Sequence, residues 1–175
     1  SGSVWANGEI CLPCHAPHNI ASPGVGPLWN HAVTTASYEV YGPDPGNPYP
    51  TEEALDEGSI LCMSCHDGTV AVDAFGGGAG SFTITGDSNL GTDLTDDHPV
   101  GRSGEYPTHG GFNDPATWEN TAGFGFNLKE MDIDGVPTPV VGCGTCHEAH
   151  NRNNLDYFLW VDNAGSQLCL ACHNK

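Results

Sequence analysis

The sequence predicts a mostly irregular fold with few short α-helices and minor β-structure, built around groups that the side chains themselves do not provide. Leu, Ile, Val and Phe make up just under a fifth of the 175 residues, and the formal net charge is −18, from 22 acidic and 4 basic residues. A chain with so little apolar content and so much charge is not expected to fold on its side chains alone. The 24 glycines and 13 prolines favour loops over long elements.

The missing core is indicated by a motif, Cys-x-x-Cys-His, that occurs four times and uses all eight cysteines. This spacing is the signature of a covalently attached c-type haem. One helical turn lets two thiols reach the two vinyl groups of a porphyrin, while the adjoining imidazole becomes the proximal iron ligand. The predicted thioether cysteines are Cys11, Cys14, Cys62, Cys65, Cys143, Cys146, Cys169 and Cys172. The predicted proximal ligands are His15, His66, His147 and His173.

Other chemistries also use Cys-x-x-Cys pairs. Eight cysteines could form two four-thiolate zinc sites, iron–sulfur sites, redox dithiols or disulfides. None of these needs a histidine directly after the pair, and here all four pairs have one. We therefore expect four haems, called I to IV in chain order, to form the core of the fold. Without them we expect no stable structure.

The other elements are expected to be short. The β-branched and aromatic residues of Ala32–Tyr41 favour a strand or extended segment. Thr51–Gly58 is the best helix outside the motifs, because Thr51 can cap it and acidic residues follow. Alternation in Ser81–Thr85 predicts a short strand, and Ser166–His173 predicts a short helix carrying the fourth motif. The other three motifs are expected to occupy single helical turns.

The motifs divide the single expected domain, residues 1–175, into three parts. Residues 1–75 carry haems I and II, residues 76–135 form a Gly- and Asp-rich segment of loops and short strands, and residues 136–175 carry haems III and IV. The leading motif of each pair is extended by a histidine three residues on, and Asn follows it in both cases. This predicts a degenerate internal duplication.

Five histidines remain to act as distal ligands, which is more than four irons need, so we expect bis-His ligation throughout. His18 and His150 lie three residues after a proximal histidine. On a helix they would share its face and therefore ligate a different iron. His31 and His98 are the next candidates, and His109 is the reserve ligand.

Methionine is a weaker alternative for the distal position. Met63 lies between two haem-binding cysteines, and Met131 lies in what reads as an acidic loop. The acidic stretches Asp93–Asp97 and Asp132–Gly135 lack the ligand spacing of an EF-hand, so solvated loops are favoured over calcium sites. The four tryptophans are expected to pack against porphyrin faces.

Charge and hydropathy limit the partners. No basic patch exists to meet nucleic acid or an anionic membrane, and no run of 18 apolar residues could span a bilayer. The start Ser1-Gly2-Ser3, without Met, is consistent with a removed export signal or with trimming. The resemblance of the four motifs to those of c-type cytochromes, whose haems are attached outside the cytoplasm, implies location in the periplasm or outside the cell.

Several segments together resemble the doubled-motif multihaem c-type cytochromes, and most closely the tetrahaem subunits of extracellular cytochrome filaments. The segments are Cys11–Asn19, Pro27–His31, Leu61–Val70, His98–Gly101 and Cys143–His150. The resemblance implies a fold wrapped around a stacked haem chain and a homopolymer in which the haems continue from subunit to subunit. It also implies that His18 ligates a haem of the neighbouring subunit. The partners implied are an upstream electron-donor cytochrome and an extracellular electron acceptor.

The function predicted is electron transfer by outer-sphere hopping between low-potential haems, without catalysis. A filament subunit is favoured over a soluble periplasmic tetrahaem carrier. A multihaem reductase would need an iron with an open distal position and acidic groups beside it, which the surplus of histidines disfavours.

Overall fold

The computed structural model describes residues 8–18, 28–42, 49–107, 110–120 and 127–174. The helices are α1 (Thr51–Ala54), α2 (Glu57–His66), α3 (Cys143–Cys146) and α4 (Gln167–Cys172). The strands are β1 (Glu39–Val40), β2 (Asp93–Leu94), β3 (Lys129–Ile133) and β4 (Val136–Val140). Short 3₁₀ turns and irregular chain make up the rest, as predicted.

The first departure from the sequence prediction is at α2. The single helix expected over Thr51–Gly58 is wrong: the chain forms α1, breaks, and restarts as α2. The restart is set by Asp56, whose extended backbone and buried carboxylate make it the N-cap, accepting the N–H of Ser59 at 3.1 Å. The second haem motif therefore lies at the end of a ten-residue helix.

The strand predicted at Ser81–Thr85 is also wrong. The Asp73 carboxylate accepts the N–H groups of Ser81 and Phe82, at 2.7 and 2.8 Å. These are the donors that a partner strand would need, so a side chain replaces the expected ladder. Further upstream, the stretch Ala32–Tyr41 is largely extended, as predicted. Its residues Glu39 and Val40 form β1, which pairs in parallel with β2.

Met131 does not lie in an acidic loop. It is a buried residue of β3, which pairs antiparallel with β4. The two-residue turn between them is Asp134-Gly135, both with positive φ, the combination that two-residue hairpins favour. Close to the C-terminus, the predicted helix is confirmed as α4, although it ends at Cys172 rather than at the following histidine.

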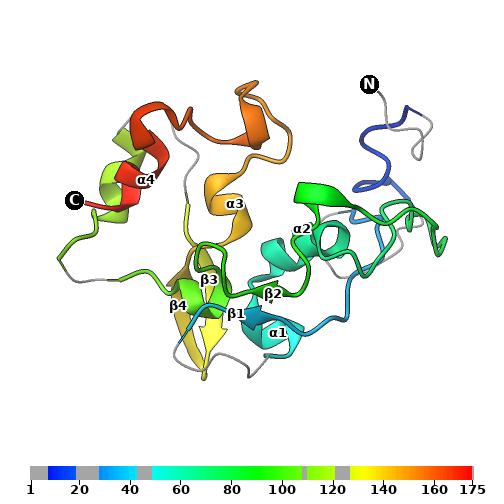
Figure 1. The fold of residues 1–175 in the computed structure, drawn as a ribbon, viewed down its shortest axis with the longest axis horizontal. Helices are drawn as coiled ribbons and strands as arrows, with labels where there is room; N and C mark the ends of the chain where they lie inside the picture. Colours follow the sequence, from blue (N-terminus) through cyan, green and yellow to red (C-terminus); the bar gives the residue numbers. More distant parts are fainter. Residues whose placement is uncertain (1–7, 19–27, 43–48, 108–109, 121–126, 175) are drawn as a thin grey trace.

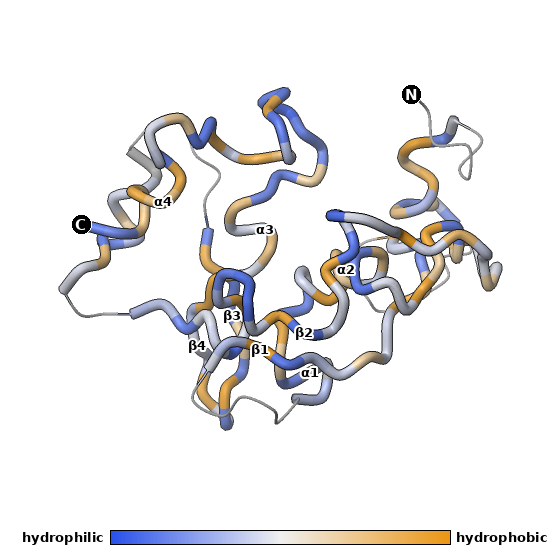
Figure 2. Tube along the Cα trace, in the orientation of Figure 1, coloured by the Kyte–Doolittle hydropathy of each residue, from blue (hydrophilic) through white to orange (hydrophobic). Residues whose placement is uncertain are grey.

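Side-chain packing is divided into two small clusters. One joins buried residues of β1, α1, α2 and β2, with Tyr38, Leu55 and Met63 almost wholly buried. The other surrounds Trp118 and Tyr106, whose rings meet edge to face with centroids 5.1 Å apart. Figure 2 shows apolar stretches scattered along the chain rather than gathered in one core. This is the divided interior expected of a chain folded around other groups.

The four motif-bearing segments follow one another in chain order along the long axis of the molecule. Figure 1 shows the N-terminal segment at one end, then α2, α3 and, at the other end, α4. In the part of the chain that the structure describes, no helix has the length and apolarity needed to cross a membrane.

Candidate haem-binding centres

Each motif is held on one helical turn, as predicted. Outside α2, the backbone N–H of the motif histidine donates to the carbonyl of the first cysteine. The three bonds are His15 to Cys11 at 2.9 Å, His147 to Cys143 at 3.0 Å and His173 to Cys169 at 2.9 Å. This backbone hydrogen bond brings both thiols and the imidazole of a motif to the same turn, which is the arrangement that two thioether bonds and a proximal ligand require.

The eight cysteine side chains are half-buried or exposed, and none is in a disulfide. Burial, with the charge of Cys14 second, raises the pKa of Cys65 to about 12. Burial, followed by the charge of Cys172, raises the pKa of Cys146 to about 11. Cysteines of motifs I and II, and of motifs III and IV, therefore lie within range of electrostatic interaction.

Motifs II and III meet at the first cysteine of each. The thiols of Cys62 and Cys143 share a hydrogen bond, which raises the pKa of Cys62 and lowers that of Cys143. The backbone here is fixed by a short relay from the α2 cap, because Ser59 Oγ donates to Asp56 and accepts the N–H of Cys143 at 2.9 Å. The attachment points of motifs II and III therefore lie side by side.

The proximal histidines of motifs II and III have the environment of metal ligands. Nδ1 of His66 lies 2.8 Å from the carbonyl of Ser88, and Nδ1 of His147 lies 2.7 Å from the carbonyl of Tyr157. A carbonyl at Nδ1 selects the tautomer that carries its proton there and leaves the Nε2 lone pair for iron. These residues fit the c-type haem that their motif implies.

Two further histidine pairs have the spacing of axial ligands. An iron bound by two imidazoles, with metal–nitrogen bonds of about 2 Å, holds the ring centroids roughly 6 Å apart. The centroids of His15 and His150 are 6.2 Å apart, with ring planes inclined by 14°. Those of His98 and His173 are 6.3 Å apart, with planes inclined by 71°. Each pair combines one predicted proximal and one predicted distal histidine.

The shared helical face predicted for His147 and His150 is wrong. α3 ends at Cys146, and His147 has extended backbone angles, so His150 lies on the following loop rather than on a shared helical face. That loop carries it to His15, 135 positions earlier in the sequence. Helical spacing could not have shown this contact, because it depends on the docking of the N-terminal segment against the loop after α3.

The other candidates for the distal position differ in their surroundings. His18 is exposed on the turn that follows motif I. His31 is buried, with Nδ1 2.7 Å from the carbonyl of Ala32 and Nε2 3.0 Å from that of Ala71. Its Nε2 would have to leave this carbonyl to bind iron. His109 lies outside the described residues.

Sequence reasoning missed two buried carboxylates that directly follow proximal histidines, Asp67 and Glu148. Burial would raise the pKa of Asp67, but bonds from Thr34, Thr69 and Tyr38 outweigh it and hold that pKa below its ordinary value. The Thr34 and Tyr38 hydroxyls each donate to Asp67 Oδ2 at 2.7 Å. An acidic residue directly after His in two of the four motifs was the available signal.

Glu148 is held in the same manner, by the loop that carries His150. Its carboxylate accepts the backbone N–H of Arg152 at 2.6 Å and that of His150 at 3.2 Å. The Arg152 bond is the main reason that the pKa of Glu148 falls to about 2. Glu148 Oε1 also lies 3.3 Å from Nδ1 of His150, so this carboxylate contacts the ring of a candidate ligand.

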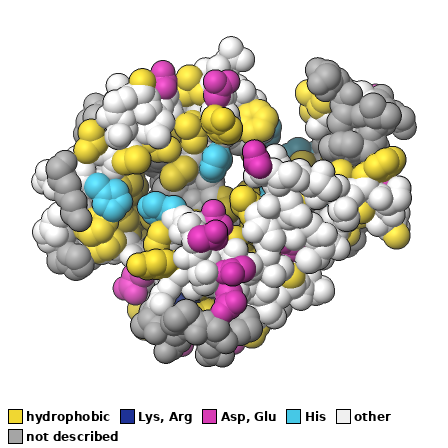
Figure 3. Space-filling model, viewed as in Figure 1, with side chains coloured by type: hydrophobic (Ala, Val, Ile, Leu, Met, Phe, Trp, Pro, Cys, Tyr) yellow, Lys and Arg dark blue, Asp and Glu magenta, His cyan; other side chains and the backbone are white. Residues whose placement is uncertain are grey.

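The molecular surface agrees with histidines that lie beside apolar groups. In Figure 3, histidine and hydrophobic side chains gather around the hollows on the visible face, while acidic side chains lie along their edges.

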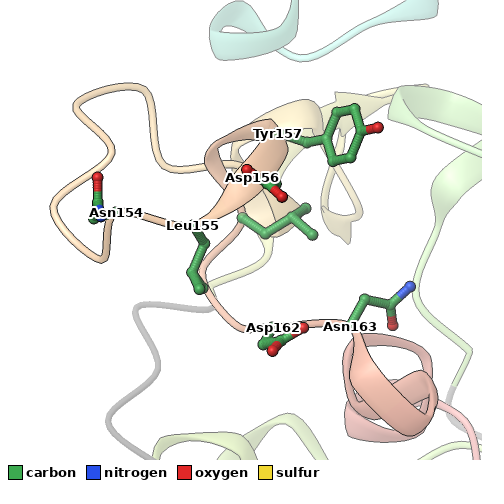
Figure 4. Close-up of a pocket in the computed structure, with 7 residues that line it drawn as sticks. Asn154, Leu155, Asp156, Tyr157, Asp162 and Asn163 are labelled. Carbon is green, nitrogen blue, oxygen red and sulfur yellow. The ribbon is translucent and has the colours of Figure 1, made fainter.

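A separate cavity of about 340 Å³ lies beside the loop after α3 (Figure 4). One side is the segment that provides the carbonyl for His147, and the other is the segment that leads to Cys169. Its lining is largely polar and includes Asn154, Asp156 and Asp162.

One comparison with known proteins agrees with the assignment of the motifs. Residues 138–175 match the family model described as the doubled CXXCH motif. Over these residues the chain is similar to the multihaem c-type cytochromes. The match covers motifs III and IV, and the same Cys-x-x-Cys-His pattern at residues 11–15 and 62–66 implies two further haem sites. No curated protein matches the chain.

A multihaem c-type cytochrome transfers electrons, and its haems are attached outside the cytoplasm. Bound haem would supply the one-electron iron chemistry. The cysteines of this chain would hold the macrocycle by thioethers, and the carbonyls at Nδ1 would set the tautomers of His66 and His147 as axial ligands. Among the residues that the structure describes, no group of three or more His, Cys, Asp or Glu side chains has the arrangement of a separate metal site.

Proposed function

We propose that this protein is a subunit of an extracellular filament that conducts electrons through four bis-His c-type haems. The observation that carries the electron-transfer part is the pair of ring separations, 6.2 Å for His15 with His150 and 6.3 Å for His98 with His173. In this proposal His150 is the distal ligand of haem I and His98 is the distal ligand of haem IV. An iron with two strong axial ligands passes electrons and offers no position for a substrate.

Haems II and III then require His18 and His31, with His109 in reserve. His31 lies beside motif II, its Nε2 3.5 Å from Cys65 Sγ. His18 is exposed on the turn that follows motif I, in the N-terminal segment that lies at one end of the row of motifs in Figure 1. We propose that His18 ligates a haem of the neighbouring subunit, so that the polymer is joined by iron–imidazole bonds. The alternative is a soluble periplasmic carrier in which His18 ligates a haem of its own chain.

The adjacency of successive motifs supports a conduit rather than four isolated redox centres. Cys14 interacts electrostatically with Cys65, Cys62 shares a hydrogen bond with Cys143, and Cys146 interacts electrostatically with Cys172. Covalent attachment at neighbouring sites holds the macrocycles close, and the chain adds no reacting group to this function. Electrons would enter from a donor cytochrome and leave to an external acceptor.

The test is His18→Ala, compared with Pro17→Ala, which changes another exposed residue on the same turn. Wild type and Pro17→Ala should form unbranched filaments in electron micrographs and show only low-spin ferric haem by electron paramagnetic resonance. His18→Ala should remain monomeric, with one high-spin iron among the four, and added imidazole should restore the low-spin signal without restoring filaments. Wild-type protein that stays monomeric with four low-spin haems would contradict the filament and support the soluble carrier.

A further inference from the structure

We infer that Glu148 sets the reduction potential of haem I by accepting the Nδ1 proton of its distal ligand, His150. The inference rests on the proposed ligation of haem I by His15 and His150. The observation specific to it is the position of the Glu148 carboxylate. Glu148 Oε1 is 3.3 Å from His150 Nδ1, on the side of the ring away from a ligating Nε2. Glu148 acts through His150, so it is a positioning residue for the iron ligand.

The Glu148 carboxylate is held by hydrogen bonds from its own loop as well as by its contact with the His150 ring. The side chain of Glu148 is only 3% exposed, whereas those of His150 and Arg152 are about 70% exposed. The backbone N–H of Arg152 donates to Oε2 at 2.6 Å, and that of His150 donates to Oε1 at 3.2 Å. Arg152 Nε lies 3.4 Å from Oε1 as well. Oε1 is therefore held in position by the loop itself and cannot turn away from the imidazole.

A carboxylate at Nδ1 makes the imidazole a stronger donor to the metal than a backbone carbonyl does. A stronger donor favours the ferric over the ferrous state and lowers the reduction potential. The second ring pair provides the contrast within the same chain, because Nδ1 of His98 lies 3.0 Å from the carbonyl of Pro99. The predicted proximal ligands His66 and His147 also contact backbone carbonyls through Nδ1. Haem I therefore has a charged acceptor behind its distal ligand, where these three histidines have a neutral one.

The experiment is a spectro-electrochemical titration of wild type, Glu148→Gln and the control Asp156→Asn. Asp156 lies on the same loop and is exposed, so the control removes the same charge without removing a contact to a histidine ring. In Glu148→Gln, one of the four one-electron steps should move to higher potential. The ferrous-to-ferric ratio of that haem at fixed potential should rise about tenfold, a shift of about 59 mV. Asp156→Asn should leave the same step nearly unchanged.

Two measurements distinguish a failure of the role inferred for Glu148 from a failure of the ligation proposed for His150. His150→Ala should convert one iron to high spin and alter the same step that moves in Glu148→Gln, which should itself stay low-spin. If His150→Ala yields a high-spin iron but Glu148→Gln shifts no step, or shifts it no more than Asp156→Asn does, the role of Glu148 is overturned and the ligation stands. If His150→Ala keeps four low-spin irons, the proposed ligation fails and the inference fails with it.

Discussion

Single residues in this chain act chiefly by closing hydrogen bonds around the haem ligands. Asp67 follows a proximal histidine and is buried, which would be costly for an unpaired carboxylate. It is stabilised because Thr34, Tyr38 and Thr69 all donate to it. This network connects the extended chain before β1 to the end of α2, and so positions the segment that carries motif II.

Replacing one donor of this network tests its contribution. Tyr38→Phe removes the hydroxyl that lies 2.7 Å from Asp67 Oδ2, in a side chain that is fully buried. We expect the free energy of unfolding of the haem-loaded protein to fall by about 1.5 kcal/mol, the lower range for a hydrogen bond to a charged group, because two other donors remain. Denaturant titration followed by far-UV circular dichroism measures this.

The matched control is Tyr41→Phe, because the Tyr41 side chain is exposed. It should change the free energy of unfolding by no more than about 0.5 kcal/mol. Equal losses in the two variants would mean that the Asp67 network does not stabilise the fold.

At the scale of elements, the contact between α2 and α3 decides how closely motifs II and III approach. Asp56 caps α2 and holds Ser59, which accepts the N–H of Cys143 at the start of α3. Gly142 makes this approach possible, since a Cβ at that position would overlap the Asp56 carboxylate. The position of α3 thus depends on the absence of a side chain at Gly142 as much as on the hydrogen bonds around it.

Gly142→Ala should therefore push α3 away from α2 and lower the free energy of unfolding by about 1–3 kcal/mol, the usual effect of overpacking. Gly144→Ala is the control in the same motif. Its Cβ would meet only the flexible end of Lys129, at 3.3 Å, and alanine is the better helix former. Thermal unfolding of both variants, monitored by the Soret band, should separate them. A Gly142→Ala protein as stable as Gly144→Ala would show that α2 and α3 can separate without cost.

At the scale of the whole molecule, the chain has too little apolar packing to hold itself together. The described side chains form two small clusters rather than one core, and 22 acidic residues repel one another against 4 basic ones. The four macrocycles would supply the apolar surface that is missing, and each would link two cysteines of one turn.

Chain produced without haem should accordingly lack a stable fold. We expect a disordered far-UV circular dichroism spectrum, no cooperative thermal transition and rapid amide hydrogen exchange throughout, whereas the haem-loaded protein should unfold in a defined transition. A cooperative transition in the haem-free chain would show that the two clusters are sufficient, and the fold would then not depend on its cofactors.

The sequence by itself determined the mostly irregular fold and the local form of the four motifs, from which the number of haem sites, their thioether cysteines and their proximal histidines are predicted. The cysteines and histidine of each motif lie within one helical turn, so their geometry follows from spacing alone. For the same reason, patterns within a few residues of one another, such as the short helix at the C-terminus, were predicted correctly.

Only the tertiary structure showed that His15 lies opposite His150 and His98 opposite His173. The first of these pairs depends on a loop docking across more than a hundred residues, and the carboxylate of Glu148 reaches His150 through the fold of that loop. The misjudged elements have a more local origin, since the Asp73 side chain took the N–H groups of a predicted strand eight and nine positions on, and Asp56 restarted a predicted helix. Spacing alone encodes neither kind of contact, because ring pairing joins residues far apart in the sequence and capture of backbone donors by a side chain competes with the regular element that the pattern predicts.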